Sequence, residues 1–164
     1  MILGFIGVGK ISSSVIQGIS SSKIKYRKII LSPRNIKLSN SLKKKFTKIE
    51  IAKSNQDVID KSNWVFLAIT PDVGKKIIKN FKFRSNQTVI SFISTIKLYE
   101  LKKAVKVKAK IVRAIPLPPI SLKKGPIPIC PPNSKVKAFF NNLGTTVEIK
   151  NEKSSINFWS TSGM

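Results

Sequence analysis

A short apolar segment that ends in two closely spaced glycines is the feature that most constrains this chain. Residues 2–6 are apolar and too few for a helix, and Gly7 and Gly9 follow directly. From about residue 10 to residue 21, apolar residues recur at the spacing of one helix face. A buried strand that turns sharply into a helix is typical of a unit whose next strand runs parallel to the first.

The same alternation continues along the sequence. β-rich apolar segments predict further strands at 28–31, 49–51, 64–69, 88–93, from 111 and at 146–149. Helical spacing predicts helices at 35–46, 55–61, 72–81, around 98–105 and at 134–143. The fold class is therefore α/β, a doubly wound, mostly parallel sheet of seven or eight strands with helices on both faces. In such a sheet, ligands bind at the carboxyl ends of the strands, here the first and fourth.

The absence of histidine excludes several kinds of chemistry. Without histidine the chain lacks the commonest general base, histidine-based triads and nearly all zinc sites. We therefore expect no metal centre, and no catalytic residue can be assigned.

Cys130 is the single cysteine, which fits a reducing compartment. With no apolar stretch of membrane-spanning length and no basic leader, a cytoplasmic protein without a membrane partner is expected.

The net charge of +24, from 31 basic and 7 acidic residues, produces a positive field that attracts polyanions. Lysine dominates over arginine, and the basic residues are spread along the whole chain, with 43–45 as the longest run. No nucleic-acid-binding motif accompanies them. We therefore expect no specific nucleic-acid partner, and leave open whether the positive charge has a functional partner.

The glycine-rich turn matches the dinucleotide-binding fingerprint of a Rossmann fold with one substitution. Gly7 allows the tight turn, Gly9 lets the pyrophosphate approach the backbone, and Ser12 replaces the third glycine, whose role is close packing. The helix start then presents free N–H groups to phosphate. The alternative is a tight turn with no ligand. The predicted pyrophosphate segment consists of Ile6, Gly7, Val8, Gly9, Lys10, Ile11 and Ser12.

The end of the second strand indicates which dinucleotide binds. NAD enzymes usually carry an acidic residue there, which holds the ribose hydroxyls. This chain has Ser32, Arg34 and Asn35 instead, and no acidic residue before Glu50. Hydroxyl and guanidinium groups bind a 2′-phosphate, whereas a carboxylate repels it. We therefore predict NADP as the cofactor; the alternative is a turn in which Asn35 caps the next helix and Arg34 is solvated.

Together these segments resemble the pyrroline-5-carboxylate reductase family and its neighbouring NADP-dependent oxidoreductases. The resemblance rests on the order and spacing of segments 4–9, 32–35, 65–71, 89–96 and 113–116, together with Asn55. It implies hydride transfer from NADPH to a small cyclic imine such as pyrroline-5-carboxylate, in proline biosynthesis. It also implies further contacts with the ribose and nicotinamide, from Asn55, Ala68, Ile69, Thr70, Pro71 and Ser94.

The chain departs from the family pattern where nicotinamide and substrate would bind. Thr70 stands in place of a lysine, Ser94 and Thr95 replace an alanine–glycine pair, and Leu117 and Pro118 replace asparagine and threonine. The exact substrate is therefore open. A related NADP oxidoreductase of the deazaflavin-dependent type and a non-enzymatic nucleotide-binding module are the alternatives.

The expected domains are an NADP-binding Rossmann domain at 1–150 and a stub at 151–164. The segment 158–163 resembles the start of the family's helical C-terminal domain. In the family that domain makes the dimer and much of the substrate site. We therefore expect a catalytically incomplete chain, and a homodimer or larger assembly if the helical domain is present.

Overall fold

Eight strands form one sheet in the order β3-β2-β1-β4-β5-β6-β7-β8 in the computed structural model, which describes residues 1–155. Neighbouring strands run parallel except β6 and β7, which are antiparallel. The predicted doubly wound, mostly parallel sheet is therefore confirmed. The strands are β1 (Ile2–Ile6), β2 (Lys28–Leu31), β3 (Ile49–Ile51), β4 (Trp64–Leu67), β5 (Thr88–Ser91), β6 (Lys110–Ala114), β7 (Pro126–Cys130) and β8 (Thr145–Glu148).

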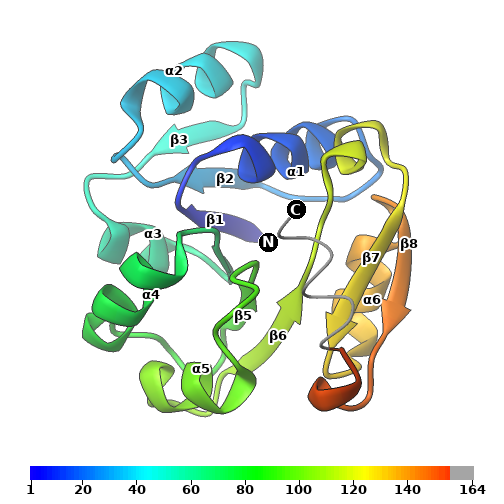
Figure 1. The fold of residues 1–164 in the computed structure, drawn as a ribbon. Helices are drawn as coiled ribbons and strands as arrows, with labels where there is room; N and C mark the ends of the chain where they lie inside the picture. The colour runs from blue at the N-terminus through cyan, green and yellow to red at the C-terminus, as the bar shows by residue number, and fades with distance from the viewer. Residues whose placement is uncertain (156–164) are drawn as a thin grey trace.

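Helices cover both faces of the sheet (Figure 1). The apolar residues of α1, α2 and α6 pack on one face, and those of α3, of the α4–η1 segment and of α5 pack on the other. The α-helices are α1 (Lys10–Ser20), α2 (Ile36–Lys45), α3 (Asn55–Lys61), α4 (Pro71–Ile77), α5 (Leu98–Val105) and α6 (Ser134–Phe140). Three short 3₁₀ segments complete the described chain, η1 (Ile78–Asn80), η2 (Pro118–Leu122) and η3 (Glu152–Ser155).

Strand β7 was not predicted, because it lies within a proline-rich segment and proline is rare inside sheets. The carbonyl groups of Gly125 and Ile129 face β8 and accept its N–H groups, whereas the carbonyl of Pro128 faces β6 and accepts the N–H of Ile115. The prolines Pro126 and Pro128 therefore lie with their missing N–H groups toward β6. Pairing on that side is short, with only two matched residue pairs, so the missing donors cost little.

Strands β4 and β5 each end two residues earlier than predicted, and β8 ends one residue earlier. Strands β4 and β5 stop at Leu67 and Ser91, so residues 68–70 and 92–97 form loops at the carboxyl edge of the sheet. None of the helices within residues 1–155 is long and apolar enough to cross a membrane. The segment 158–163, predicted to begin a helical domain, lies outside the described residues.

An aromatic cluster on β1, β4 and α6 fixes the α1 side of the core. The rings of Phe5 and Phe66 are stacked with centroids 4.5 Å apart, and Phe139 lies 5.9 Å from Phe66. Both Phe5 and Phe66 are fully buried. Since β1 and β4 border the predicted crevice, this cluster sets the spacing of the two strands on which a ligand site there depends.

We predict that Phe66→Ala lowers the free energy of unfolding by about 3–5 kcal/mol, because it removes a fully buried ring and leaves a cavity. Tyr99→Ala is the matched control, since Tyr99 is 66% exposed and its loss is expected to change the stability by less than about 0.5 kcal/mol. Urea unfolding of both variants measures the two effects. Equal losses would show that the cluster does not determine the stability of the sheet.

Candidate dinucleotide-binding site

The turn between β1 and α1 depends on Gly7. Its φ of +93° lies in the region that side chains rarely adopt, and a Cβ there would come within 2.3 Å of the Ala68 carbonyl oxygen. Only glycine therefore allows β1 to turn into α1 while the end of β4 lies this close.

Two serine hydroxyls hold the Gly7 peptide groups in place. The Gly7 N–H donates to Ser32 Oγ at 3.0 Å, and the Gly7 carbonyl accepts from Ser12 Oγ at 2.8 Å. Ser32 is 1% exposed and Ser12 is fully buried. Both side chains thus order the glycine turn. Ser32, which is predicted to contact a 2′-phosphate, accepts the Gly7 N–H with its hydroxyl oxygen.

The start of α1 is open to an anion. Gly9 is the N-cap in extended conformation, and no side chain of the described residues caps the helix. A Cβ added at Gly9 would meet no atom of residues 1–155 within 4 Å apart from its chain neighbours, so no described side chain fills the space beside it. The first N–H groups of an uncapped helix, next to a glycine that leaves the backbone accessible, are suited to bind a pyrophosphate.

The turn after β2 lies against this loop. Asn35 Nδ2 donates to the Val8 carbonyl at 3.0 Å, while Asn35 Oδ1 accepts the N–H of Leu38 and so caps α2. Arg34, between Ser32 and Asn35 in the sequence, is exposed. Its position beside the glycine loop suits a guanidinium that holds a phosphate on the adenosine ribose.

The remaining predicted contacts lie after β3, β4 and β5. Asn55 is the half-buried first residue of α3, and Asp57 in the same turn accepts the N–H of Lys53, an interaction that lowers the pKa of the Asp57 carboxyl. After β4, Ala68 and Ile69 are half-buried, Thr70 is exposed and Pro71 begins α4.

A pocket of about 290 Å³ lies where the first turn of α1 faces the loops after β5 and β6. Lys10, Ile11 and Ser94, all predicted from the sequence, line it. Leu117 and Pro118, which the family resemblance places near nicotinamide and substrate, also line it. No contact was predicted for the remaining lining residues, although they follow β5 and β6 at the carboxyl edge, which was the available signal. They are Phe92, Ile115 and Pro116.

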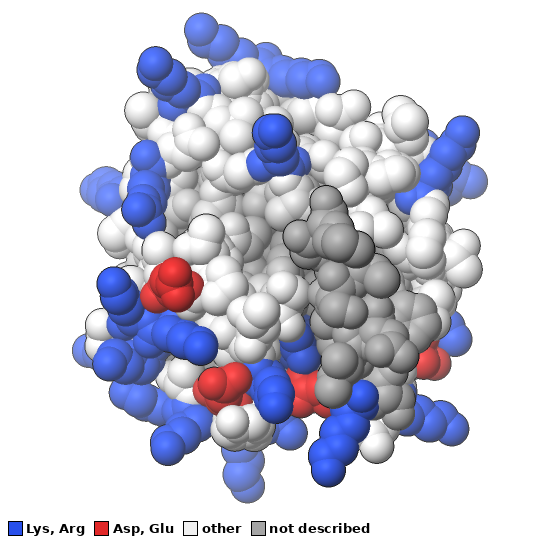
Figure 2. Space-filling model, in the orientation of Figure 1, with Lys and Arg blue, Asp and Glu red and all other residues white. Residues whose placement is uncertain are grey.

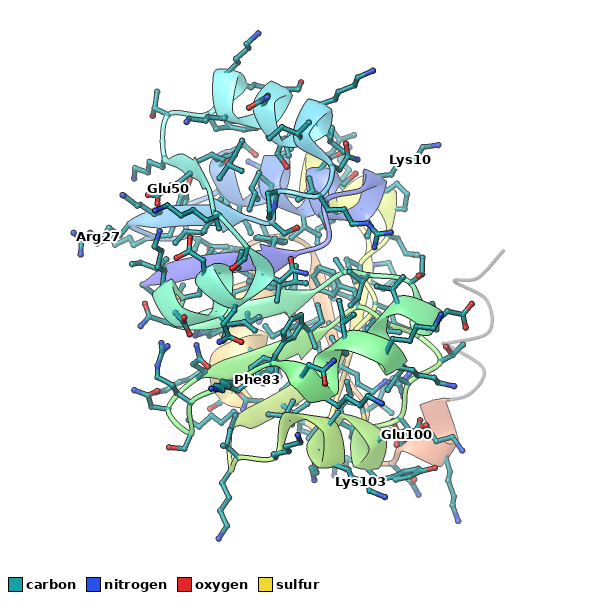
Figure 3. The ribbon with its side chains drawn as sticks, turned by 90° about the vertical axis from the view of Figure 1, so that its left-hand side faces the viewer. Lys10, Arg27, Glu50, Phe83, Glu100 and Lys103 are labelled. Carbon is teal, nitrogen blue, oxygen red and sulfur yellow. The ribbon has the colours of Figure 1, made fainter. Side chains whose placement is uncertain are left out.

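The electrostatics of the site favour an anionic ligand. Figure 2 shows Lys and Arg side chains around the outline of the molecule, with few acidic groups between them. Lys10 lies at the carboxyl edge of the sheet, and Arg27, which precedes β2, lies at the opposite edge (Figure 3).

Burial raises the pKa of the Cys130 thiol, and the Glu152 carboxylate raises it further while Arg113 lowers it. Cys130 is therefore protonated at neutral pH and is a poor nucleophile.

Most of the predicted site residues meet at one edge of the sheet, but they play different parts. Lys10, Ile11, Arg34 and Thr70 leave side-chain surface open to a ligand. The side chains of Ile6 and Val8 are buried, so only their backbone can contact one. Sequence spacing located the edge, and the hydrogen bonds separate residues that shape the loop from residues that face outward.

Comparisons with known proteins agree with the observed fold. Residues 2–95 match the family model described as "NADP oxidoreductase coenzyme F420-dependent". Pyrroline-5-carboxylate reductase 3 of Danio rerio is 26% identical over 126 residues, which are 75% of this chain and 43% of that protein. The chain thus spans less than half the length of this curated relative.

Two solved structures share the fold. The pyrroline carboxylate reductase of Plasmodium falciparum, determined with NADP bound, is 25% identical with a TM-score of 0.82, covering 99% of this chain and 62% of that one. The 1-pyrroline-5-carboxylate reductase of Streptococcus pyogenes is 23% identical with a TM-score of 0.80, covering 98% and 61%. Because the family model covers more than half of the chain, this protein belongs to the coenzyme F420-dependent NADP oxidoreductase family.

Proposed function

We propose that this chain binds NADPH at the carboxyl ends of β1, β2 and β4 and presents it for hydride transfer. The observation that carries the proposal is the uncapped start of α1 beside Gly9, where a pyrophosphate has both N–H donors and room. The predicted pyrophosphate contacts are the backbone of residues 7–12.

The adenosine end of the cofactor lies toward β2 in this proposal. Arg34 binds the 2′-phosphate. Ser32 and Asn35 do not need to contact the cofactor for this, because they stabilise the glycine loop that leads into α1. Asn55 and residues 68–71 border the two riboses. The wide excess of positive charge adds a long-range attraction for the anionic cofactor.

The nicotinamide end lies toward the 290 Å³ pocket, where Lys10, Ser94 and the apolar residues around it would orient the ring. When bound, NADPH supplies the hydride, and the protein supplies position and excludes water. We propose a cyclic imine such as pyrroline-5-carboxylate as the acceptor, as in the two reductases above, with proline as the product. A deazaflavin acceptor is the second candidate, because the matching family model carries that cofactor in its name.

Residues 1–150 are proposed to be the cofactor half of the reductase. The reductases of known structure are longer, and this chain covers 61–62% of them. Residues 151–164 are proposed to begin a helical domain that completes the substrate site and a dimer.

We predict that Gly9→Val abolishes binding of both NADPH and NADH while the protein stays folded. The branched side chain fits the extended Gly9 backbone but fills the space that the pyrophosphate needs. Gly7→Ala is the contrasting variant, expected to lose at least about 1 kcal/mol of stability, because it strains the backbone and meets the Ala68 carbonyl. Fluorescence titration and thermal unfolding measure the two effects. Normal NADPH binding by Gly9→Val would leave the loop as a simple turn.

The cofactor preference supplies a second prediction. Wild-type protein is expected to bind NADPH at least about tenfold more tightly than NADH, a difference of about 1.4 kcal/mol. Arg34→Ala should abolish this difference and leave NADH affinity unchanged, since NADH carries no 2′-phosphate. Arg27→Ala, an exposed arginine at the opposite edge of the sheet, is the control and should change neither affinity. A preference that survives Arg34→Ala would place the 2′-phosphate elsewhere.

A further prediction concerns whether this chain alone can both bind the cofactor and reduce the imine. The 164-residue chain is expected to bind NADPH but not to oxidise it with pyrroline-5-carboxylate, because the groups that bring the reacting atoms together are incomplete. Fusion to the C-terminal helical domain of a pyrroline-5-carboxylate reductase should restore turnover. NADPH absorbance is followed with the imine and, separately, with a deazaflavin. Efficient imine reduction by the chain alone would show a complete active site, and turnover only with the deazaflavin would replace the proposed substrate.

A further inference from the structure

Arg113, on β6, is the one charged residue among residues 1–155 that is buried, with 2% of its surface exposed. A charge in such a place is costly unless it is paired and hydrogen-bonded. The other cationic residues described by the structure avoid that cost by remaining at least partly exposed. The position of Arg113 therefore needs a reason in the structure around it.

Two other segments within residues 1–155 supply partners of Arg113. Its guanidinium forms an ion pair with the Glu152 carboxylate of η3 and donates a hydrogen bond to the Ser94 carbonyl in the turn after β5. Glu152 Oε1 also accepts the N–H of Leu98, the first residue of α5, at 2.9 Å. One ion pair thus joins β6, the β5–α5 loop, the start of α5 and η3.

This ion pair is connected to the proposed nicotinamide pocket through Ser94, whose carbonyl accepts a hydrogen bond from Arg113. Ser94 forms part of one wall, and the other wall, residues 115–118, continues the chain from β6 just beyond Arg113. The side chain of Arg113 is therefore hydrogen-bonded to the wall that contains Ser94, and its backbone leads directly into the wall formed by residues 115–118. The Ile115 N–H, bonded to the Pro128 carbonyl at 3.0 Å, fixes the second wall to β7. A change in the ion pair would move the walls relative to each other.

We propose that the Arg113–Glu152 pair is a positioning device that sets the spacing of the two pocket walls and thereby the fit of the nicotinamide end of the cofactor. This inference rests on the proposed NADPH-binding function. The pair also connects the pocket to η3, the segment that follows the sheet, so the placement of that segment is coupled to the cofactor site.

A role in stability alone is the competing explanation, and the geometry distinguishes the two. The residues that hold the pyrophosphate loop, Ser12, Ser32 and Asn35, form no hydrogen bond or ion pair with Arg113 or Glu152. Loss of the ion pair should therefore weaken binding only at the nicotinamide end. A general loss of stability would weaken binding at both ends.

The test compares two ligands in Glu152→Gln, which keeps the size of the side chain and removes its charge. NADPH spans the whole site, whereas adenosine 2′,5′-bisphosphate occupies only the adenosine end. We expect the affinity for NADPH to fall about tenfold and that for adenosine 2′,5′-bisphosphate to change less than about twofold. Glu148→Gln is the matched control, because Glu148 on β8 forms an exposed pair with Lys137 at 3.5 Å, and it should change neither affinity.

A readout without ligand accompanies the titrations. Amide hydrogen exchange of residues 94–98 should become faster in Glu152→Gln than in the wild type. The Leu98 N–H would then donate to a neutral amide oxygen in place of a carboxylate, and the Arg113 side chain that holds the Ser94 carbonyl would lose its charged partner, so both restraints weaken. Equal loss of affinity for both ligands, or unchanged NADPH affinity in a folded variant, would overturn the inference. If Glu152→Gln does not fold, Glu152→Asp, which keeps the charge on a shorter side chain, takes its place with the same expected split.

The two proposals fail in different ways. A wild-type chain that binds neither ligand would overturn the NADPH-binding function itself. Unchanged exchange at residues 94–98 would then separately show that the ion pair does not order the loop.

Discussion

The close approach of β1 and β4 at Gly7 is the constraint on which the rest of the site depends. With a φ of +93°, and with the Ala68 carbonyl oxygen 2.3 Å from where a Cβ would lie, this position accepts only a residue without a side chain. The turn it permits sends α1 back over the sheet with its first N–H groups at the carboxyl edge. Every proposed pyrophosphate contact follows from that direction.

The hydrogen bonds around Gly7 make the loop rigid before any ligand arrives. Ser32 and Ser12 hold its two peptide groups, and Asn35 holds the next carbonyl, that of Val8. A loop already in its binding shape loses little conformational entropy when a ligand binds, so more of the interaction energy appears as affinity. Polar side chains near a ligand site can thus serve affinity without touching the ligand.

The sequence predicted the sheet and the sheet edge at which the candidate site lies, because the spacing of apolar residues and the glycine and proline residues that end strands are local signals. Helix α3 begins and ends at the predicted residues, since Ser54 caps it and the apolar spacing is clear. Strand β7 was missed because the cost of its prolines depends on the neighbouring strand, which the local sequence does not show. The same limit applies to Ser32, whose partner Gly7 lies 25 residues away, and to Arg113, whose partner Glu152 lies 39 residues away. Such long-range contacts decide which polar residues face a ligand and which stabilise the loop.

The large positive charge and the choice of cofactor are separate matters. A net charge of +24 attracts any dinucleotide, but salt screens exposed charges beyond about 10 Å, so the charges spread over the surface cannot distinguish NADPH from NADH by a single phosphate. That distinction needs a cation at the end of β2 and no carboxylate beside it, which is the arrangement of Arg34 in a chain with no acidic residue before Glu50. The buried Arg113 also acts through its position, because its proposed effect comes from the two segments that it joins and not from its contribution to the electrostatic field at the surface. In this protein the placement of individual arginines, against a background of many lysines, is what can give the cofactor site its selectivity and its shape.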